Sequence, residues 1–574
     1  MPVELPDPTV PKRNLRTLAV GAGAALLLLG GFALGVSKLT NSPAPVPDNL
    51  RCAQPAAIVP DFAAKGVSNS SIFTTPEYEQ RSLELLAGAV RIPTVAYDDM
   101  SFDVAHEPRF EVFNDLHAYL AAQFPHLAKH RETVNTYGLL YTIKGSDPDL
   151  KPVVLMAHQD VVPVEPTTLD QWDHPPFDGV FDGKHLFGRG SCDTKNSLIA
   201  IHEAVEALLA QHYTPKRTLL LSFGFDEEIQ GFRGARPLAE LIEQRYGPDS
   251  IEMLIDEGFG LTDTFGSYFA TPGVAEKGRV NFRFTLNTPG GHSSAPPDHT
   301  GIGIIADLVT RLESDIPLEP SLGPDNVAQG TFACQGWYGN DDLDPSLRSL
   351  YTNLQTPAVA NELAKMLSED RFTRILVETT QAIDIVRGGV KVNALPEQVV
   401  AEVNYRIKPD SSVEAETERV RAFVASVAKD FHLAANYSNA FNPGPNDAPE
   451  VILPAHDGAA GFLHLETTDI LHVAPVSPYH NDTHWDLLSG TTKHALEDVA
   501  RGFDKDVVMG PGLMTGNTDT AHYWNLTKNL YRFNPSLSSD LANVHTVNEQ
   551  LNPRSHYSAV IFFYEFVLNM DKDL

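Results

Sequence analysis

Acidic and histidine side chains stand at the ends of short apolar segments in this sequence. The residues concerned are His158 and Asp160 after 153–157, Glu227 and Glu228 after 218–225, and Asp256 after 251–255. Short apolar runs are typical of strands buried on both faces of a parallel sheet, and such sheets carry their sites at the strands' carboxyl ends. Imidazole and carboxylate groups on one edge can bind divalent metals. We therefore expect a metal site built for chemistry.

Two pairs of residues indicate how such a site would work. His158 and Asp160 fall on the same side of a strand, so the histidine could bind a metal through one ring nitrogen while a carboxylate orients the other. Adjacent Glu227 and Glu228 would point in opposite directions, leaving one carboxylate for metal and one as general base for a water. Asp193 follows a glycine-rich turn and could bridge two cations.

Each of these residues also has an ordinary structural interpretation. A His-x-Asp pair is common on protein surfaces, and an acidic pair is often merely solvated. Asp193 precedes a helical pattern and could be its N-cap. His545 is one of 21 histidines, and spacing alone does not select it. The patterns favour a metal hydrolase without fixing its ligands.

Apolar runs alternate with helical patterns in the segment that carries most of these residues. Residues 196–211 have the periodicity of an amphipathic helix, and the alternation is typical of an α/β domain with a mostly parallel sheet. Further on, 279–286 and 399–406 alternate polar and apolar side chains, as strands with one wet face do. A helical pattern over 413–429 follows. The change of pattern indicates a second, α+β domain.

The predicted architecture is a catalytic α/β domain interrupted by an inserted α+β lid domain and preceded by one transmembrane helix. A helical pattern over 485–500 and a strand pattern over 506–509 mark the return to the catalytic domain. The boundaries are 1–16 for a cytoplasmic tail, 17–37 for a transmembrane signal anchor, 38–75 for a linker, 76–276 and 479–574 for the catalytic domain, and 277–478 for the lid.

The segment 17–37 carries no charge and is long enough to span the ~30 Å hydrocarbon core of a bilayer. Lys12, Arg13 and Arg16 precede it, which favours a cytoplasmic N-terminus and a lumenal catalytic part. A cleaved signal peptide is the alternative. Four glycosylation acceptor patterns agree with this topology, at Asn69, Asn436, Asn481 and Asn525.

Charge and cysteine content narrow the class of protein. The formal net charge of −31 in 574 residues argues against a nucleic-acid partner, because phosphate backbones need basic surfaces. Three cysteines allow at most one internal disulfide bond, so disulfides do not hold the fold together. The chain is long enough for two or more domains with full cores.

The order of the motifs closely resembles that of the M20 metallopeptidases, the two-zinc carboxypeptidase and aminoacylase relatives, over residues 75 to 574. The motifs are 158–160, 172–177, 188–195, 226–228, 290–294, 393–396, 516–523 and 543–549. The N-terminal anchor and the large lid are most similar to the fungal vacuolar carboxypeptidase S group, with the secreted N-acyl-amino-acid hydrolases of animals as near relatives. This resemblance implies a vacuolar membrane protein.

The resemblance also implies a role for each site residue. The implied metal ligands for two zinc ions are His158 and Asp256 for one, Glu228 and His545 for the other, and Asp193 as the bridge. The implied catalytic and substrate-binding residues are Glu227 as general base, Asp160 as the group that orients His158, His292 as the oxyanion-stabilising group, and Asn393 and Arg406. A guanidinium such as that of Arg406 also fits a terminal carboxylate bidentately.

The implied reaction removes the C-terminal residue of a short peptide by means of a metal-activated water. An N-acyl amino acid is the alternative substrate, because it too presents an amide beside a free carboxylate. A non-haem iron oxygenase would use a similar His-x-Asp…His pattern, but Asp193, Glu228 and Asp256 are surplus to it. A non-catalytic binding protein would be expected to have lost a ligand or the base, and none is missing. The lid, near two hundred residues, is long enough to supply His292 within its own chain, and a homodimer that exchanges this residue is the alternative.

Overall fold

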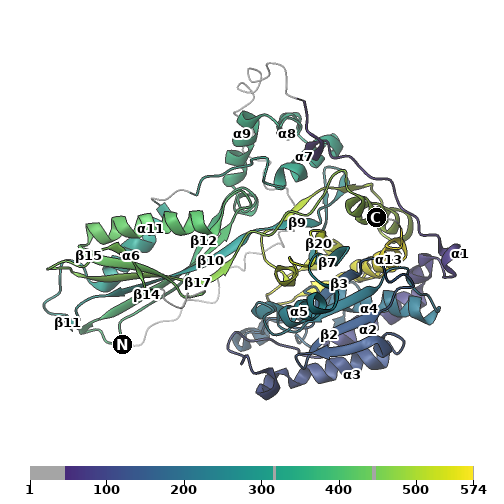
Figure 1. Cartoon of the computed structure of the whole chain (residues 1–574), viewed down its shortest axis with the longest axis horizontal. Helices are drawn as coiled ribbons and strands as arrows, with labels where there is room; N and C mark the ends of the chain where they lie inside the picture. Colours follow the sequence, from purple (N-terminus) through teal and green to yellow (C-terminus); the bar gives the residue numbers. More distant parts are fainter. Residues whose placement is uncertain (1–44, 315–317, 442–447, 573–574) are drawn as a thin grey trace, which may run out of the picture.

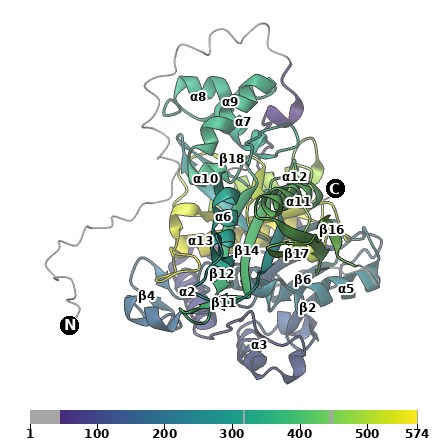
Figure 2. The same cartoon turned by 90° about the vertical axis from the view of Figure 1, so that its left-hand side faces the viewer.

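A computed structural model describes residues 45–314, 318–441 and 448–572. Three lobes make up the molecule: a catalytic lobe, an elongated lid, and a small helical lobe that lies beyond the catalytic lobe in both views (Figures 1 and 2). The predicted anchor at 17–37 lies outside the described residues. Among the residues that are described, no helix is both long and apolar enough to cross a membrane.

A ten-stranded sheet forms the centre of the catalytic lobe, in the order β1-β2-β6-β3-β7-β20-β9-β19, with β8 beside β7 and β18 beside β8. Its strands are β1 (Arg131–Val134), β2 (Gly138–Ile143), β3 (Val153–His158), β6 (Leu219–Gly224), β7 (Met253–Thr264), β8 (Ser267–Ala270), β9 (Gly273–Glu276), β18 (Val507–Met509), β19 (Gly512–Met514) and β20 (Leu530–Leu537). The central strands β6, β3, β7 and β20 are parallel, whereas β1–β2, β2–β6, β7–β8 and β20–β9 pair antiparallel. The sheet is thus mixed, where the sequence predicted a mostly parallel one.

Helices cover both faces of this sheet. One face packs against α2 (Pro76–Val90), α4 (Lys195–Ala210) and α13 (Pro553–Asn569), and the other against α5 (Ala235–Tyr246). Successive residues of β3 alternate between the two cores, since Leu155 belongs to the first and Val154 to the second. The helix predicted over 196–211 is confirmed as α4, and it is almost wholly buried because α2 and α13 pack over it.

The lid is built on a six-stranded sheet in the order β12-β14-β10-β17-β15-β16. Its elements are β10 (Gly278–Asn287), β12 (Thr380–Gly388), β14 (Gln398–Ile407), β15 (Leu433–Asn439), β16 (Glu450–Leu453), β17 (Gly461–Leu471), α6 (Gly301–Ser314) and α11 (Val413–Asp430). Both helices pack on one face of the sheet, where every second side chain of β10 and β14 is buried. The predictions of alternating strands and of a helix over 413–429 are confirmed.

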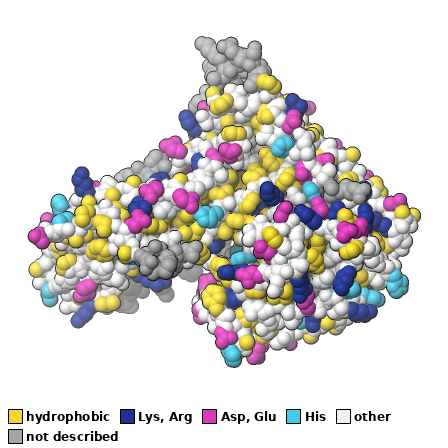
Figure 3. Space-filling view, viewed as in Figure 1, with side chains coloured by type: hydrophobic (Ala, Val, Ile, Leu, Met, Phe, Trp, Pro, Cys, Tyr) yellow, Lys and Arg dark blue, Asp and Glu magenta, His cyan; other side chains and the backbone are white. Residues whose placement is uncertain are grey.

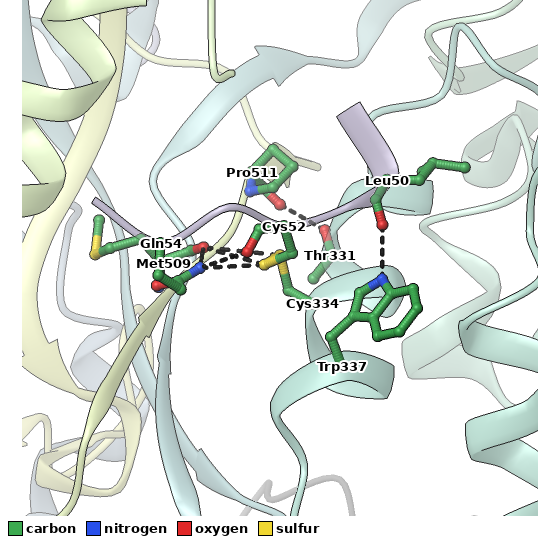
Figure 4. The surroundings of a disulfide bond; sticks show 8 residues. All are labelled: Leu50, Cys52, Gln54, Thr331, Cys334, Trp337, Met509 and Pro511. Carbon is green, nitrogen blue, oxygen red and sulfur yellow. Dashed lines mark hydrogen bonds between the residues drawn. A yellow bond between two sulfur atoms is a disulfide. The ribbon is translucent and has the colours of Figure 1, made fainter. Parts of the chain in front are cut away.

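Helices that the sequence did not predict interrupt the lid. They are α7 (Ala328–Tyr338), α8 (Pro345–Tyr351), α9 (Pro357–Ser368) and α10 (Arg371–Arg374). This helical lobe has an apolar core of its own and packs through α7 against β18 and β19 of the catalytic sheet. A disulfide bond joins its Cys334 to Cys52, on the segment that precedes the catalytic lobe (Figure 4).

Shorter elements complete the structure. Near the catalytic edge, β4 (Val180–Phe181), β5 (Leu186–Phe187), β21 (Leu541–Ala542) and β22 (Gln550–Leu551) form a small sheet, and β11 (Gly291–His292) pairs with β13 (Ala394–Leu395) at the free end of the lid. The remaining helices are α1 (Phe62–Lys65), α3 (Phe113–Gln123) and α12 (Thr483–Lys493). The helix predicted over 485–500 ends as a π-helical turn, His494–Val499. Basic and acidic side chains intermingle on the visible surface (Figure 3).

Candidate metal centre and substrate site

His158 and Asp160 lie at the carboxyl end of β3 and are fully buried. The ring nitrogen Nδ1 of His158 is 3.0 Å from the backbone oxygen of Asp160 and 3.3 Å from its carboxylate. The other nitrogen, Nε2, points to the acidic side chains of the site. Asp160 therefore orients the imidazole and leaves Nε2 free to bind a metal.

Asp193 lies between two histidines that come from distant parts of the chain. Its Oδ1 is 3.0 Å from Nε2 of His158, and its Oδ2 is 3.0 Å from Nε2 of His545. Glu228 approaches the same nitrogen of His545 at 3.2 Å. One carboxylate with an oxygen directed toward each histidine is the geometry expected of a ligand shared by two ions.

Glu257, which the sequence analysis did not select, lies nearer to His158 than the predicted ligand Asp256 does. Its Oε1 is 3.4 Å from Nε2 of His158, and its carboxylate belongs to a group of three potential metal ligands with His158 and Glu227. Asp256 is buried instead, with Oδ2 lacking a hydrogen-bond partner among the described residues. Glu257 is therefore a further candidate for the fifth ligand beside Asp256, whose unpartnered buried oxygen also suits a cation.

Glu227 and Glu228 lie on a 3-10 turn that follows β6, so they are not the last residues of the strand itself. Asp160 holds this turn, because its two carboxylate oxygens accept hydrogen bonds from the backbone N–H groups of Glu227 and Glu228 at 3.1 and 3.0 Å. Glu228 then faces His545, whereas Glu227 faces Glu257. The two carboxylates diverge as predicted, but a turn rather than strand alternation separates them.

The site gathers several buried carboxylates, and positive charge would stabilise them. Burial and the neighbouring Glu257 raise the pKa of Glu227, and burial raises that of Glu228 to about 7. Hydrogen bonds to Asp193 and Glu228 raise the pKa of His545 to about 10. So many carboxylates out of water need cations as partners.

The donor set fits two divalent ions. Two groups that share His158 could each hold an ion, because within each group the ligand atoms lie within 4.8 Å of one another: His158–Glu227–Glu257 and His158–Asp193–Glu228. Imidazole nitrogens and carboxylate oxygens are ligands that zinc accepts. Each ion would have a histidine, a carboxylate and a share of Asp193, with one ion near His158 and Glu257 and the other near Glu228 and His545.

Arg406 lies on β14 at the hinge, the end of the lid sheet where β10 follows β9 of the catalytic lobe. Its Nη1 donates a hydrogen bond of 2.7 Å to Oδ1 of Asn517, and Nδ2 of Asn517 donates to the backbone oxygen of Lys277. Burial, followed by the like charge of Arg279, lowers the pKa of the Arg406 guanidinium. Asn517 shares a loop with Asp519, whose charge acts on the pKa of Glu227. The loop thus joins Arg406 to the catalytic edge.

His292 and Asn393 lie at the opposite end of the lid and are exposed. Along the sheet, Arg406 pairs with Arg279 whereas Gln398 pairs with Asn287, eight residues further on. At the usual rise per strand residue this is a distance of about 27 Å, and the β11–β13 pair lies beyond it, at the far end of the lid from β3 and β7 (Figure 1). The structure does not bring His292 and Asn393 to the metal ligands of their own chain.

Glu257, Asn517 and Glu549 belong to the centre but were not among the residues predicted from the sequence. Strand parity does not find Glu257: His158 has the parity of Val154, which pairs with Leu254 of β7, so parity favours Asp256. Asn517 stands within a motif of the family but received no role. The same is true of Glu549, which follows His545 by four residues.

Comparisons with known proteins agree with this geometry. The family model "Peptidase family M20/M25/M40" matches residues 154–569. Carboxypeptidase S from Saccharomyces cerevisiae is 38% identical over 99% of this chain and 100% of its own length. The N-fatty-acyl-amino acid synthase/hydrolase PM20D1 of Bos taurus is 34% identical over 85% of this chain and 88% of its own.

A solved structure supports the fold. The M20 family metallo-carboxypeptidase Sso-CP2 from Sulfolobus solfataricus superimposes with a TM-score of 0.55 at 16% identity, covering 85% of this chain and 99% of that one. The resemblance drawn from the motifs is confirmed, because the family model matches most of the sequence. The chain therefore belongs to peptidase family M20/M25/M40.

Proposed function

We propose that this protein is a two-zinc carboxypeptidase that removes the C-terminal residue of short peptides. The observation that carries the proposal is the position of Arg406, a partly desolvated guanidinium linked through Asn517 to the loop beside the metal ligands. Such a group selects a free carboxylate, and the loop of Asn517 also carries Asp519, whose charge acts on the pKa of Glu227. The full-length similarity to carboxypeptidase S supports the same reaction.

Each side chain has a defined task in this reaction. The two zinc ions, when bound, supply an acidified water and a Lewis acid for the carbonyl oxygen. Glu227 takes the proton of that water and later delivers it to the leaving amine. Asp160 fixes both the His158 ring and the turn that carries Glu227. Arg406 holds the terminal carboxylate, which places the scissile amide at the metal edge.

A substrate panel tests the proposal. Purified protein should contain two zinc ions per chain and should release the C-terminal residue from an N-blocked dipeptide. The same peptide with an amidated C-terminus should be cleaved poorly. Efficient cleavage of the amide, or activity that persists after complete metal removal, would refute a metal-dependent carboxypeptidase.

N-acyl amino acids are the second candidate substrates. They also carry an amide beside a free carboxylate, and the PM20D1 relatives are named for that activity. The decisive measurement is the ratio of kcat/KM for the N-blocked dipeptide and for a long-chain acyl amino acid with the same C-terminal residue. A ratio well above one supports the peptidase, and a ratio well below one supports the acyl hydrolase.

We further propose a homodimer in which the lid of one protomer completes the site of the other. His292 and Asn393 are remote from their own metal ligands, yet an oxyanion needs a donor beside the metal centre. The lid's free end also exposes apolar side chains, with Val390 and Val392 fully accessible, and β12 is an edge strand able to pair with another. Such a patch is typical of an interface.

Complementation between two inactive variants tests the dimer. His292→Ala and Glu227→Gln each disable one component of the site, and a mixed dimer would contain one site with both defects and one intact site. Half of the dimers in an equimolar, randomly assorted mixture are mixed, so co-refolding should restore about a quarter of wild-type activity. A monomer in solution, or no recovery on mixing, would refute the arrangement.

We propose that the catalytic part lies in a lumen, behind a signal anchor at 17–37. A disulfide bond between Cys52 and Cys334 fits an oxidising compartment, and Asn69, Asn481 and Asn525 are exposed, as acceptor sites must be. The resemblance to the vacuolar group favours the vacuole membrane. Full-length protein should stay with membranes after carbonate washing, and its recovery in the supernatant would contradict an anchor.

A further inference from the structure

Glu549 is a fully buried carboxylate at the join of the two loops that carry Asp193 and His545. Its Oε1 accepts hydrogen bonds from the backbone N–H groups of Gly190, Cys192 and Asp193, at 3.1, 2.9 and 3.3 Å. Its other oxygen, Oε2, accepts a hydrogen bond of 2.6 Å from Arg189. One side chain thus binds the whole turn that leads into the bridging residue.

The partners of Glu549 are themselves held in place. The Arg189 guanidinium lies over the ring of Trp172, with 5.6 Å between its carbon and the ring centroid. Next to Trp172, the backbone N–H group of Asp173 donates a hydrogen bond of 2.7 Å to Oδ1 of Asn548. In return, Nδ2 of Asn548 donates one of 3.0 Å to the Asp173 carboxylate. Three sequence motifs, those at 172–177, 188–195 and 543–549, therefore meet around this carboxylate.

The contacts of Glu549 link the two segments that carry Asp193 and His545. The backbone N–H group of Asp193 donates a hydrogen bond to the Glu549 carboxylate. His545 lies four residues before Glu549 on the same loop. The Asp193 Oδ2 and the His545 Nε2 are 3.0 Å apart. His545 itself is half exposed, and its ring contacts Asp193 and Glu228. The backbone oxygen of Glu549 accepts a hydrogen bond of 2.9 Å from the N–H group of Gly188, which joins the segment of His545 to the turn of Asp193.

We propose that Glu549 is a positioning residue that sets the separation of Asp193 and His545 and thereby the affinity of the metal site formed with Glu228. The proposal rests on the two-metal function proposed above. Neutralising Glu549 would leave Arg189 without its buried counter-ion, and the turn that carries Asp193 would lose its strongest acceptor. Loss of a group that supports metal ligands typically weakens metal binding 10- to 100-fold.

The test compares Glu549→Gln with a matched control, Glu565→Gln. Glu565 is also a fully buried glutamate that accepts hydrogen bonds, from Ser70 and His494, but it touches no metal ligand. Metal-free full-length proteins are titrated with Co²⁺ against a competing chelator, and the visible spectrum of each equivalent is recorded. Urea unfolding of the metal-free forms measures how far each substitution destabilises the fold.

Glu549→Gln should bind one Co²⁺ equivalent about normally and the other at least tenfold more weakly, with an altered spectrum for the weak equivalent. The control should lose stability but retain both affinities. Wild-type affinity in Glu549→Gln, or equal weakening in both variants, would overturn the proposal. Should Glu549→Gln fail to fold, Glu549→Asp, which keeps the charge, must show the same selective loss. A wild-type protein that binds fewer than two ions would instead overturn the proposed function.

Discussion

Arg406→Ala is the sharpest test of how this site selects its substrate. The guanidinium is partly desolvated at the hinge, and its Nη1 is held by Asn517 at 2.7 Å, so it is preorganised to bind a carboxylate bidentately. Removing one partner of a buried, hydrogen-bonded charge pair costs roughly 2–5 kcal/mol. At about 1.4 kcal/mol per factor of ten, kcat/KM for a free-acid substrate should fall roughly thirty-fold or more.

The assay compares each protein on an N-blocked dipeptide and on its C-terminal amide. Wild type should prefer the acid, and Arg406→Ala should lose most of that preference while changing little on the amide. Arg406→Lys should recover the acid rate only in part, because an ammonium cannot present a planar fork. Arg283→Ala is the matched control, since Arg283 also lies on the lid sheet but pairs with Glu402 and Glu466.

Equal losses on the acid and the amide would refute this reasoning. In that case Arg406 would support the hinge through Asn517 and would not read the carboxylate. A loss in Arg283→Ala as large as that in Arg406→Ala would have the same meaning, because Arg283 lies away from the hinge contacts. Only a loss confined to Arg406 and to free acids assigns the recognition to this side chain.

Three further outcomes are expected. Glu227→Gln should abolish turnover and leave the metal content, measured by atomic absorption, nearly intact, whereas Glu228→Gln should lose one metal equivalent; a Glu227 variant with most of its kcat would contradict its role. Cys52→Ser should lower the free energy of unfolding by about 2–5 kcal/mol in non-reducing urea titrations, and an unchanged value would mean that the bridge constrains little. His494→Gln should destabilise the protein more at pH 5.5 than at pH 9. A hydrogen bond to Glu565 raises the pKa of His494 in the folded state above its usual 6.5. The ion pair therefore stabilises the fold fully below pH 6.5, and this stabilisation is lost as the pH rises through the raised pKa. A difference that does not depend on pH would contradict this ion pair.

Much of the catalytic lobe follows from local pattern. The apolar runs before His158 and Glu227 become β3 and β6, the central parallel strands, and the amphipathic repeat becomes α4. These predictions succeed because a strand buried on both faces appears as a continuous apolar run and an amphipathic helix as a repeat of apolar side chains, and a single sequence displays both. The edges of the sheet show no such pattern. The short strands β18 and β19 pair in parallel with β8 and β9, which come from a distant segment of the chain.

The helical lobe and the disulfide bond depend on such distant contacts as well. The helices α7 to α10 are short, and their core includes Leu50 from the segment before the catalytic lobe, so no local period predicts their position. The bridge from Cys52 to Cys334 spans 282 residues. Sequence alone limits the number of bridges but does not choose the pair. Glu257 is a different case, because the register of β7 against β3 puts Asp256 on the side of His158 and gives no sign that Glu257 approaches the same ring.

The remote lid residues carry a more general consequence for sites inferred from motifs. A motif set names the residues of a site, and it does not state that one chain supplies them all. Arg406 and His292 belong to the same predicted site, yet a sheet about 27 Å long separates the end that carries Arg406 from the end that carries the His292 hairpin. A rigid, well-packed sheet cannot fold back over that distance, because its core of alternating buried side chains would be opened. In this structure His292 is remote from the metal ligands of its own chain, and for this reason we propose that the lid of a second copy supplies it.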